Sequence, residues 1–172
     1  MNDALHSAGA SRRLLNGLGA LICGGLLGFA LYAQHGLGLE PCPLCVFQRV
    51  ATLALGVVFL AAYAHNPGPG GARVYGVLAT VAAGAGILFA GRQLWLQALP
   101  EDQVPACGPG YDYIMDVFPL HEAFAMIFEG SGECAEVSWS FLGLSMAGWV
   151  VVWLAALAVL AIWNNFRRVG SR

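Results

Sequence analysis

Charge is scarce in this sequence, and one basic residue type is missing altogether. Only 10% of the 172 residues are charged and none is lysine, whereas about a quarter of the residues in a soluble domain are charged. Hydrophobic residues make up 58% of the chain, and its mean hydropathy is +0.67. This composition excludes an ordinary soluble domain and predicts an integral membrane protein. The net charge of −2 and the small number of basic residues argue against nucleic acid as a partner.

Long apolar runs occur four times, and each is long enough to cross a bilayer as a helix. We therefore expect an all-α fold, a four-helix transmembrane bundle that forms a single membrane domain over residues 1–172. The paired arginines before the first run also fit a cleaved signal peptide, but that run is too long and no A-x-A site follows it. The predicted spans are 14–33, 46–64, 74–98 and 146–163, joined by loops 34–45, 65–73 and 99–145.

The arginines predict how this bundle is oriented. Six of the eight fall on one side of a four-span topology, which the positive-inside rule assigns to the cytoplasm. Both termini are then cytoplasmic, and the loops 34–45 and 99–145, which carry four cysteines, are exported to a compartment where disulfides persist. We expect a multi-pass protein of a bacterial inner membrane with its cysteine loops in the periplasm. The six arginines are Arg12, Arg13, Arg73, Arg167, Arg168 and Arg172.

The long loop 99–145 contains a short apolar segment, 121–128 (HEAFAMIF), which is too short to span a membrane. We expect it to form a horizontal helix along the membrane surface, with Phe124, Ile127 and Phe128 facing the lipid. The alternative is a loop helix that packs on the bundle.

A C-x-x-C pair, Cys42 and Cys45, stands where the second apolar run begins at Val46. The N-terminus of a helix carries partial positive charge, so we expect it to lower the pKa of Cys45. Arg49 follows on the same helix face and adds a permanent cation beside that thiol. Alternatively, Arg49 only anchors the helix at the membrane surface.

Three hypotheses account for the four loop cysteines, Cys42, Cys45, Cys107 and Cys134. They could bind zinc, although zinc sites usually present two short C-x-x-C hooks. They could be passive disulfide staples, although a C-x-x-C ring constrains little chain. They could form a redox relay between a soluble partner and a lipid-soluble electron carrier, which would explain the need for four spans. Cys23, in the middle of the first span, is expected to be a packing residue.

Several motifs together resemble the DsbB family of disulfide bond formation proteins. These are Gln34-His35 after the first span, Cys42-Pro-Leu-Cys45 with Arg49, Cys107 in the long loop, and the run from Gly132 to Met146 (GECAEVSWSFLGLSM). The resemblance implies an enzyme that reoxidises a periplasmic, thioredoxin-fold, DsbA-like dithiol oxidase and passes the electrons to a membrane quinone, either ubiquinone or menaquinone.

The same resemblance implies a role for each cysteine. Cys107 and Cys134 would be the disulfide that the partner attacks, with the mixed disulfide forming through Cys107. Cys134, once freed, would attack Cys42 and release Cys45 as a thiolate beside the quinone and Arg49. The resting pairs would be Cys107 with Cys134 and Cys42 with Cys45.

Two positions depart from the family pattern. Relatives often carry an acidic residue where this chain has Gln48, and a histidine late in the third span where this chain has none. Gln48 is itself a candidate quinone contact. Arg92, Gln93 or Gln97 could bind a quinone carbonyl in place of the histidine, or only extend toward the interface. His35 could bind the quinone or the loop, or be interfacial. The alternative functions are a vitamin K epoxide reductase-like redox protein and a four-cysteine, zinc-binding membrane adaptor.

Overall fold

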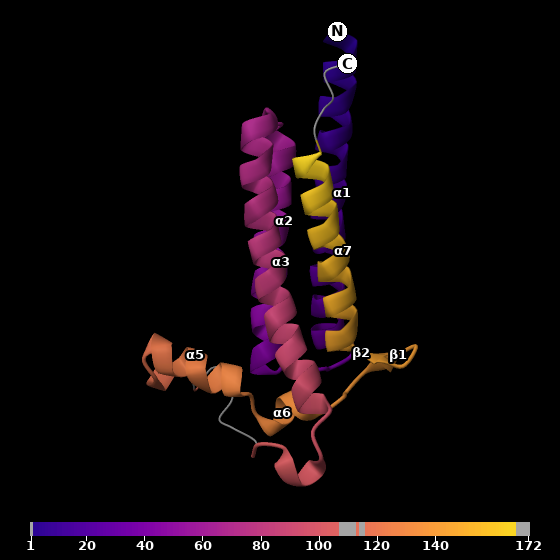
Figure 1. Cartoon of the computed structure of the whole chain (residues 1–172). Coiled ribbons are helices and arrows are strands. Elements are labelled where there is room, and N and C mark those ends of the chain that lie inside the picture. Colours follow the sequence, from indigo (N-terminus) through magenta and orange to yellow (C-terminus); the bar gives the residue numbers. More distant parts are fainter. Residues whose placement is uncertain (1, 107–112, 114–115, 168–172) are drawn as a thin grey trace.

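The computed structural model describes residues 2–106, 113 and 116–167, and its described part is dominated by helices (Figure 1). Four of the helices described are long and apolar enough to cross a membrane, which confirms the predicted all-α, four-helix fold. In chain order the elements are α1 (Asn2–Gly36), α2 (Pro43–His65), α3 (Pro69–Gln97), the 3-10 turn η1 (Glu101–Gln103), α5 (Leu120–Glu129), α6 (Gly132–Ala135), β1 (Ser140–Phe141), β2 (Leu144–Ser145) and α7 (Met146–Phe166).

Prolines set two helix starts earlier than the apolar runs suggest. Pro43 and Pro69 stand at the first positions of α2 and α3, where a missing N–H costs nothing and a fixed φ favours the helix. At the other end of α2, Asn66 caps the helix in the left-handed conformation, with φ 41°. The connection between α2 and α3 is therefore only residues 66–68, shorter than the predicted loop 65–73.

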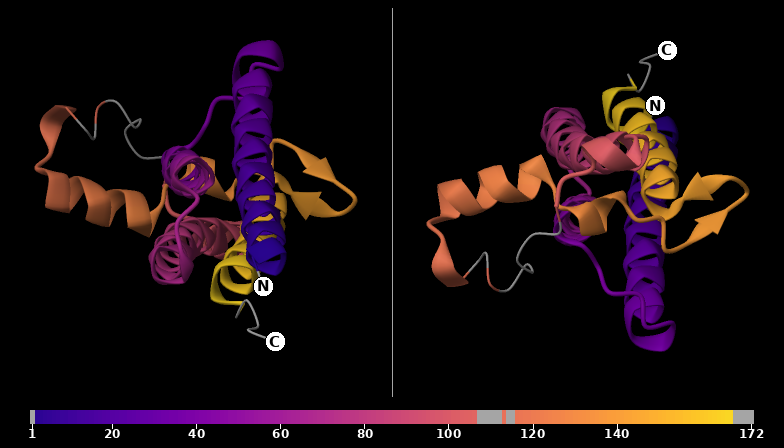
Figure 2. Two further views of the ribbon diagram at one scale, coloured as in Figure 1. Left: turned by 90° about the horizontal axis from the view of Figure 1, so that it is seen from above. Right: turned by 90° about the horizontal axis from the view of Figure 1, so that it is seen from below.

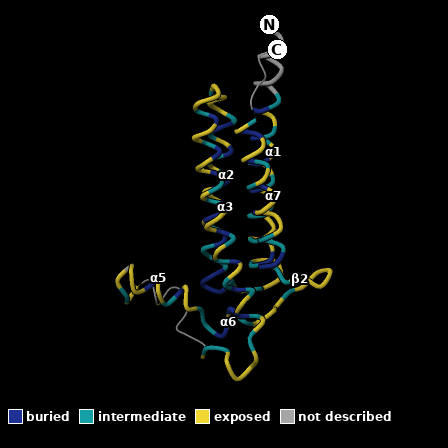
Figure 3. The backbone as a smooth tube through the Cα atoms, viewed as in Figure 1, coloured by how far each residue is buried: buried dark blue, intermediate teal, exposed yellow. Residues whose placement is uncertain are grey.

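Small side chains on one face of α3 allow close helix packing. They recur at alternating steps of four and three residues, so they form one continuous stripe along the helix. Their neighbours include Leu55 and Phe59 of α2 and Leu154 and Leu157 of α7, and Cys23 of α1 is fully buried in this same core, as expected of a packing residue. Outward-facing positions are exposed, as Figure 3 shows for the length of the bundle. The stripe consists of Ala72, Gly76, Ala79, Ala83, Gly86 and Ala90.

A buried cluster of amides joins α1 to α7 near the end of the bundle where α1 starts. Asn164 donates to the backbone oxygen of Arg12 and to Oδ1 of Asn16, each at 3.1 Å. Asn165 donates to the same Asn16 oxygen at 3.4 Å. Hydrogen bonds between helices satisfy polar groups that an apolar environment would otherwise leave unpaired.

The start of α1 and the end of α7 lie at one end of the bundle, and α5, α6 and the β1–β2 hairpin lie at the other (Figure 1). We call the end with α5, α6 and the hairpin the cysteine end. Views along the bundle show α5 and the hairpin projecting from opposite sides (Figure 2). Helix α5 covers the predicted segment 121–128, but Ile127 is only 2% exposed and packs against Leu44 and Leu96. The expectation that Ile127 faces lipid is therefore wrong, because this face of α5 packs on the bundle. The Phe128 side chain is 41% exposed. The Phe124 side chain lies outside the described part.

Candidate functional site

The C-x-x-C motif forms the N-terminal turn of α2. Cys42 is the N-cap residue in an extended conformation, and Cys45 lies within the first helical turn. This spacing places the two thiols on one face of the helix, with 3.1 Å between the Sγ atoms. That separation exceeds the disulfide bond length of about 2.05 Å. The two sulfurs are therefore in contact, as a thiol exchange that involves both of them requires.

Cys134 comes to the same place from the other loop. It lies on α6, is fully buried, and shares a core cluster with Cys42 and Leu44. The Cys42 thiol donates a hydrogen bond to the Cys134 sulfur, and backbone N–H groups of Ser131 and Leu44 donate to it as well. These donors, Cys42 foremost, lower the pKa of Cys134 to about 6. The same contact raises the pKa of Cys42, because the thiol proton is held between the two sulfurs.

The helix N-terminus also serves a thiol that sequence reasoning did not predict. Sequence reasoning placed Cys45 in front of a helix beginning at Val46, but α2 begins at Pro43. The N–H group of Leu44, one of the donors without an intrahelical partner at a helix start, points to Cys134. The sulfur contributed by α6 is therefore also stabilised as a thiolate by the N-terminus of α2.

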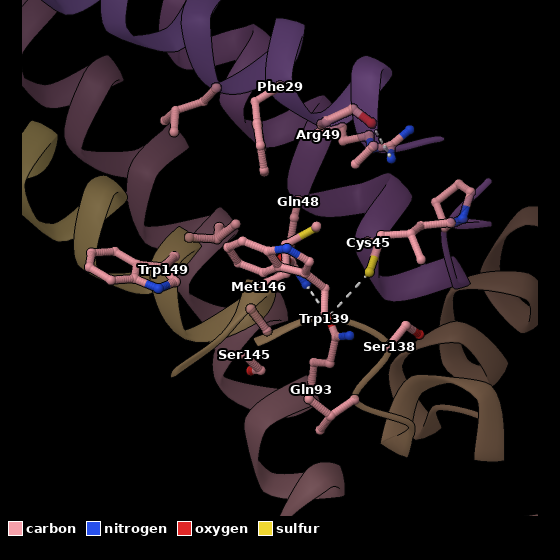
Figure 4. A pocket seen from close by; sticks show the side chains of 18 of the residues that line it. Phe29, Cys45, Gln48, Arg49, Gln93, Ser138, Trp139, Ser145, Met146 and Trp149 are labelled. Carbon is pink, nitrogen blue, oxygen red and sulfur yellow. Dashed lines mark hydrogen bonds between the residues drawn. The ribbon is translucent and has the colours of Figure 1, made fainter. Parts of the chain in front are cut away.

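A glutamine of α3 holds the inner side of the cysteine pair. Gln93 is only 5% exposed, and its Oε1 accepts a hydrogen bond from Gln48 Nε2 at 2.7 Å. The Cys45 thiol donates to the same oxygen at 3.5 Å. Both contacts are drawn in Figure 4. One amide oxygen therefore fixes the direction of the Cys45 thiol and the side chain of Gln48 together.

Cys45 opens into a cavity of about 390 Å³ between α1, α2, α3 and α7. This volume falls in the range of small-molecule sites, about 300 to 1,000 Å³. Most of the lining residues are apolar or aromatic, and the polar ones include Gln48 and Gln93, which hydrogen-bond each other beside Cys45 (Figure 4). The aromatic wall is continuous, because Trp139 makes ring contacts with both Phe29 and Phe141. The polar lining residues nearest in sequence to the cysteines are Glu40, Gln48 and Arg49.

Arg49 lines this cavity and is anchored to α1. Its Nη1 donates to Gln34 Oε1, and its Nη2 donates to the Ala30 carbonyl at 3.1 Å. Both acceptors thus belong to α1, whereas the sequence pattern predicts Arg49 beside the thiol of Cys45. Those two bonds fix the guanidinium at the cavity wall in a defined orientation.

A sequence model of one protein family, described as "Disulfide bond formation protein DsbB", matches residues 12–164 of this chain. The chain belongs to the DsbB family. It is 52% identical over 160 residues to disulfide bond formation protein B of Marinobacter nauticus. The aligned residues cover 93% of this chain and 95% of that protein. The same named protein of Nitrosococcus oceani is 51% identical over 154 residues, covering 90% and 91%.

Membership of the DsbB family confirms the resemblance seen in the sequence. It identifies the chain as a multi-pass membrane oxidoreductase of disulfide bond formation. It therefore favours a disulfide-forming redox role over the vitamin K epoxide reductase-like protein and the zinc-binding adaptor. In the described residues, no three His, Cys, Asp or Glu side chains are grouped as a metal site.

Not every residue predicted for the DsbB site is found there. His35 is exposed in the last turn of α1 and does not line the cavity. Arg92 does not line it either, because its guanidinium binds backbone oxygens of α5. Gln97 does line it and accepts a hydrogen bond from Ser145 at 2.8 Å. Cys107 lies outside the described residues.

Sequence reasoning missed the aromatic wall of Phe29 and Trp139, and it left the role of Gln93 open. A signal for Gln93 was present, because it continues the buried stripe of α3 three residues beyond Ala90. A polar side chain in such a register is predicted to face the bundle interior, not the interface.

Proposed function

We propose that this protein is a thiol:quinone oxidoreductase that reoxidises a DsbA-like, thioredoxin-fold dithiol oxidase in the periplasm. One observation carries the proposal: three sulfurs from two loops form a continuous chain that ends at an apolar cavity. Cys134 contacts Cys42, Cys42 lies 3.1 Å from Cys45, and Cys45 lines the cavity.

The order of the sulfurs supports a two-step relay. The partner's thiolate attacks Cys107 of a Cys107–Cys134 disulfide, which forms a mixed disulfide and frees Cys134 as a thiolate. Cys134 then attacks Cys42 of a Cys42–Cys45 disulfide; the Cys134–Cys42 bond forms, the Cys42–Cys45 bond breaks, and Cys45 leaves as a thiolate. Backbone N–H groups of Ser131 and Leu44 still donate to Cys134 when Cys42 is in a disulfide, and they favour the thiolate for this attack.

The partner's second thiol completes its own oxidation by attacking the mixed disulfide. Cys107 is released as a thiolate and attacks Cys134, which restores the Cys107–Cys134 disulfide and frees Cys42. Two electrons and two protons have then passed from the partner's dithiol to the Cys42–Cys45 dithiol. The remaining requirement is an acceptor that reaches Cys45 from the membrane.

The cavity suits a quinone in its donor set and its walls. Arg49 and Gln48 supply N–H donors for carbonyl oxygens, while Phe29, Trp139 and Trp149 supply flat apolar surface for a ring. When bound, a quinone supplies an acceptor for two electrons and two protons. Arg49 holds its cation at the wall where negative charge would develop. Either ubiquinone or menaquinone satisfies this chemistry.

The location follows from the same arrangement. The arginines at the termini and in the α2–α3 connection favour the cytoplasm, so we propose that the cysteine end faces the periplasm across the bacterial inner membrane. A soluble partner then meets the loop that carries Cys107, and a lipid-soluble acceptor meets Cys45 from the bilayer.

The direct test mixes the purified membrane protein with a reduced DsbA-like oxidase and a soluble quinone, and follows loss of quinone absorbance. We expect one quinone consumed per partner dithiol oxidised. Cys45→Ser should abolish quinone loss, whereas Cys23→Ala, a control that also removes one buried thiol, should retain it. Quinone loss that persists in Cys45→Ser, or none with the unmodified protein, would refute the proposed function.

A further inference from the structure

Arg92 forms a clamp between α3 and the end of α5. Its Nε donates to the Phe128 carbonyl at 3.0 Å, and its Nη2 donates to the Glu129 carbonyl at 2.8 Å. The carbonyls of a last helical turn have no intrahelical partner, and a cation there interacts favourably with the helix dipole. We propose that Arg92 is a positioning residue, which fixes the end of α5 on α3 and thereby holds Cys134 beside Cys42.

The clamp is itself held in place on α3. The guanidinium carbon of Arg92 lies 4.1 Å from the ring centroid of Trp95, a cation–π contact that restricts where the planar group can point. The side chain therefore acts as a rigid fork and not as a flexible tether. A fork with two donors matches two successive carbonyls in a way that a single ammonium group does not.

The chain between the clamp and Cys134 leaves little freedom of movement. Gly130 follows α5 with φ 80°, and a Cβ placed there would come within 2.4 Å of Leu96 Cδ1. This turn therefore lies directly on α3, and α6 begins two residues later at Gly132. Any displacement of the end of α5 is passed on to α6 and so to Cys134.

Apolar contacts continue from the clamp to the thiols. Ala123 and Ile127 of α5 are buried in one cluster with Leu96, Cys42 and Cys134. The clamp stands at the edge of this cluster, where Arg92 is half-buried. Bond formation between two thiols depends strongly on how often they meet in the right geometry, which can be expressed as an effective concentration. Arg92 raises the effective concentration of Cys134 at Cys42.

This inference deepens the proposed function, since the Cys134–Cys42 exchange belongs to it, but its test requires neither partner nor quinone. Full-length protein carrying Cys23→Ala, Cys45→Ser and Cys107→Ser keeps only Cys42 and Cys134. In glutathione redox buffers, oxidised glutathione takes two electrons from these thiols and yields two reduced glutathiones and one internal disulfide. The fraction of disulfide at equilibrium gives the effective concentration.

Arg92→Gln should lower this effective concentration about tenfold, which corresponds to about 1.4 kcal/mol. Arg92→Lys should lower it less, because the ammonium keeps the charge and one donor. Arg73→Gln, the same loss at the other end of α3, should leave it unchanged. An effective concentration in Arg92→Gln equal to that of the parent, or an equal fall in Arg73→Gln, would overturn the proposal.

A second measurement separates the clamp from the quinone contact that the sequence suggested for Arg92. In the enzyme with all its cysteines, loss of the clamp should lower kcat and leave the KM for a soluble quinone unchanged. A raised KM together with an unchanged glutathione equilibrium would show that Arg92 acts at the cavity and would contradict the positioning role.

Discussion

The ionisation of Cys134 can be tested through the hydrogen bond that contributes most to it. The Cys42 thiol is the foremost cause of the low pKa of Cys134, ahead of the backbone N–H groups of Ser131 and Leu44 and of the Ser131 hydroxyl. Replacing Cys42 by alanine removes this donor. We expect the pKa of Cys134 to rise from about 6 toward the ordinary value of 9.0.

The expected effect on reactivity is smaller than the change in ionisation. At pH 7 a thiol of pKa about 6 is about 90% thiolate, against about 1% for one of pKa 9.0, a ratio of about 90. The intrinsic nucleophilicity of a thiolate falls as its pKa falls, with a Brønsted coefficient of about 0.45. This lowers the reactivity of the thiolate of lower pKa by a factor of about 20. The net advantage of the low pKa is therefore about fourfold at pH 7, and it grows to about twentyfold at pH 6.

The assay follows thiolate absorbance against pH in protein that carries Cys23→Ala, Cys45→Ser and Cys107→Ser. The parent should show a transition near pH 6 from Cys134. In Cys42→Ala this transition should move up, whereas Cys42→Ser, which keeps a donor, should shift it less. Ser131→Ala should also shift it less than Cys42→Ala.

The sign of the pH dependence of stability follows from the same pKa. A group whose folded-state pKa is lowered stabilises the fold fully above its unfolded value, here 9.0, and loses that contribution as pH falls through about 6. Stability of the parent should therefore decline over this window more than that of Cys42→Ala. A Cys134 transition that stays near pH 6 in Cys42→Ala would refute the assignment of Cys42 as the main cause.

Three further predictions concern side chains deeper in the bundle. Arg49→Gln should raise the KM for a soluble quinone by about ten- to a hundredfold through loss of a charge-assisted hydrogen bond, and Arg49→Lys should raise it less; an unchanged KM in both would remove Arg49 from the quinone site. Gln93→Leu should leave the Gln48 amide unpaired and lower the free energy of unfolding in detergent by about 1 to 3 kcal/mol, whereas a stability equal to the parent would show that Gln48 finds another partner. Cys23→Ala should keep turnover nearly unchanged, since Cys23 lies in the packed core away from the cavity; loss of turnover in folded protein would give it a redox role.

The helices were predictable because their signal is local. Apolar runs of bilayer length predict spans wherever they pack, so all four were found. Their ends were less predictable, since they depend on single capping residues such as Pro43 and Asn66. Helix α1 also continues through the polar residues ahead of its apolar run, where Asn164 of α7 donates to the backbone oxygen of Arg12.

The site was predictable in its cysteines but not in its contacts. The C-x-x-C spacing puts two residues about one helical turn apart, so the proximity of Cys42 and Cys45 was predictable from the sequence. The contact of Cys134 with the start of α2 depends on how a long loop folds back, which no periodicity encodes. The contact of Arg92 with α5 was not predicted either. Its partners are backbone carbonyls, which any sequence in α5 would supply.

The neutral partners of Arg49 explain how a single cation can act within an apolar bundle. Burying a charge is costly unless it is paired or hydrogen-bonded, and both acceptors of Arg49 on α1, the Gln34 amide and the Ala30 carbonyl, are uncharged. They satisfy the N–H groups without cancelling the charge. Gln48 is likewise uncharged and binds Gln93, so the acidic side chains that share the cavity with Arg49 are Glu40 and Glu136. In the proposed function, the positive charge of Arg49 at the cavity wall favours the negative charge that develops on an acceptor.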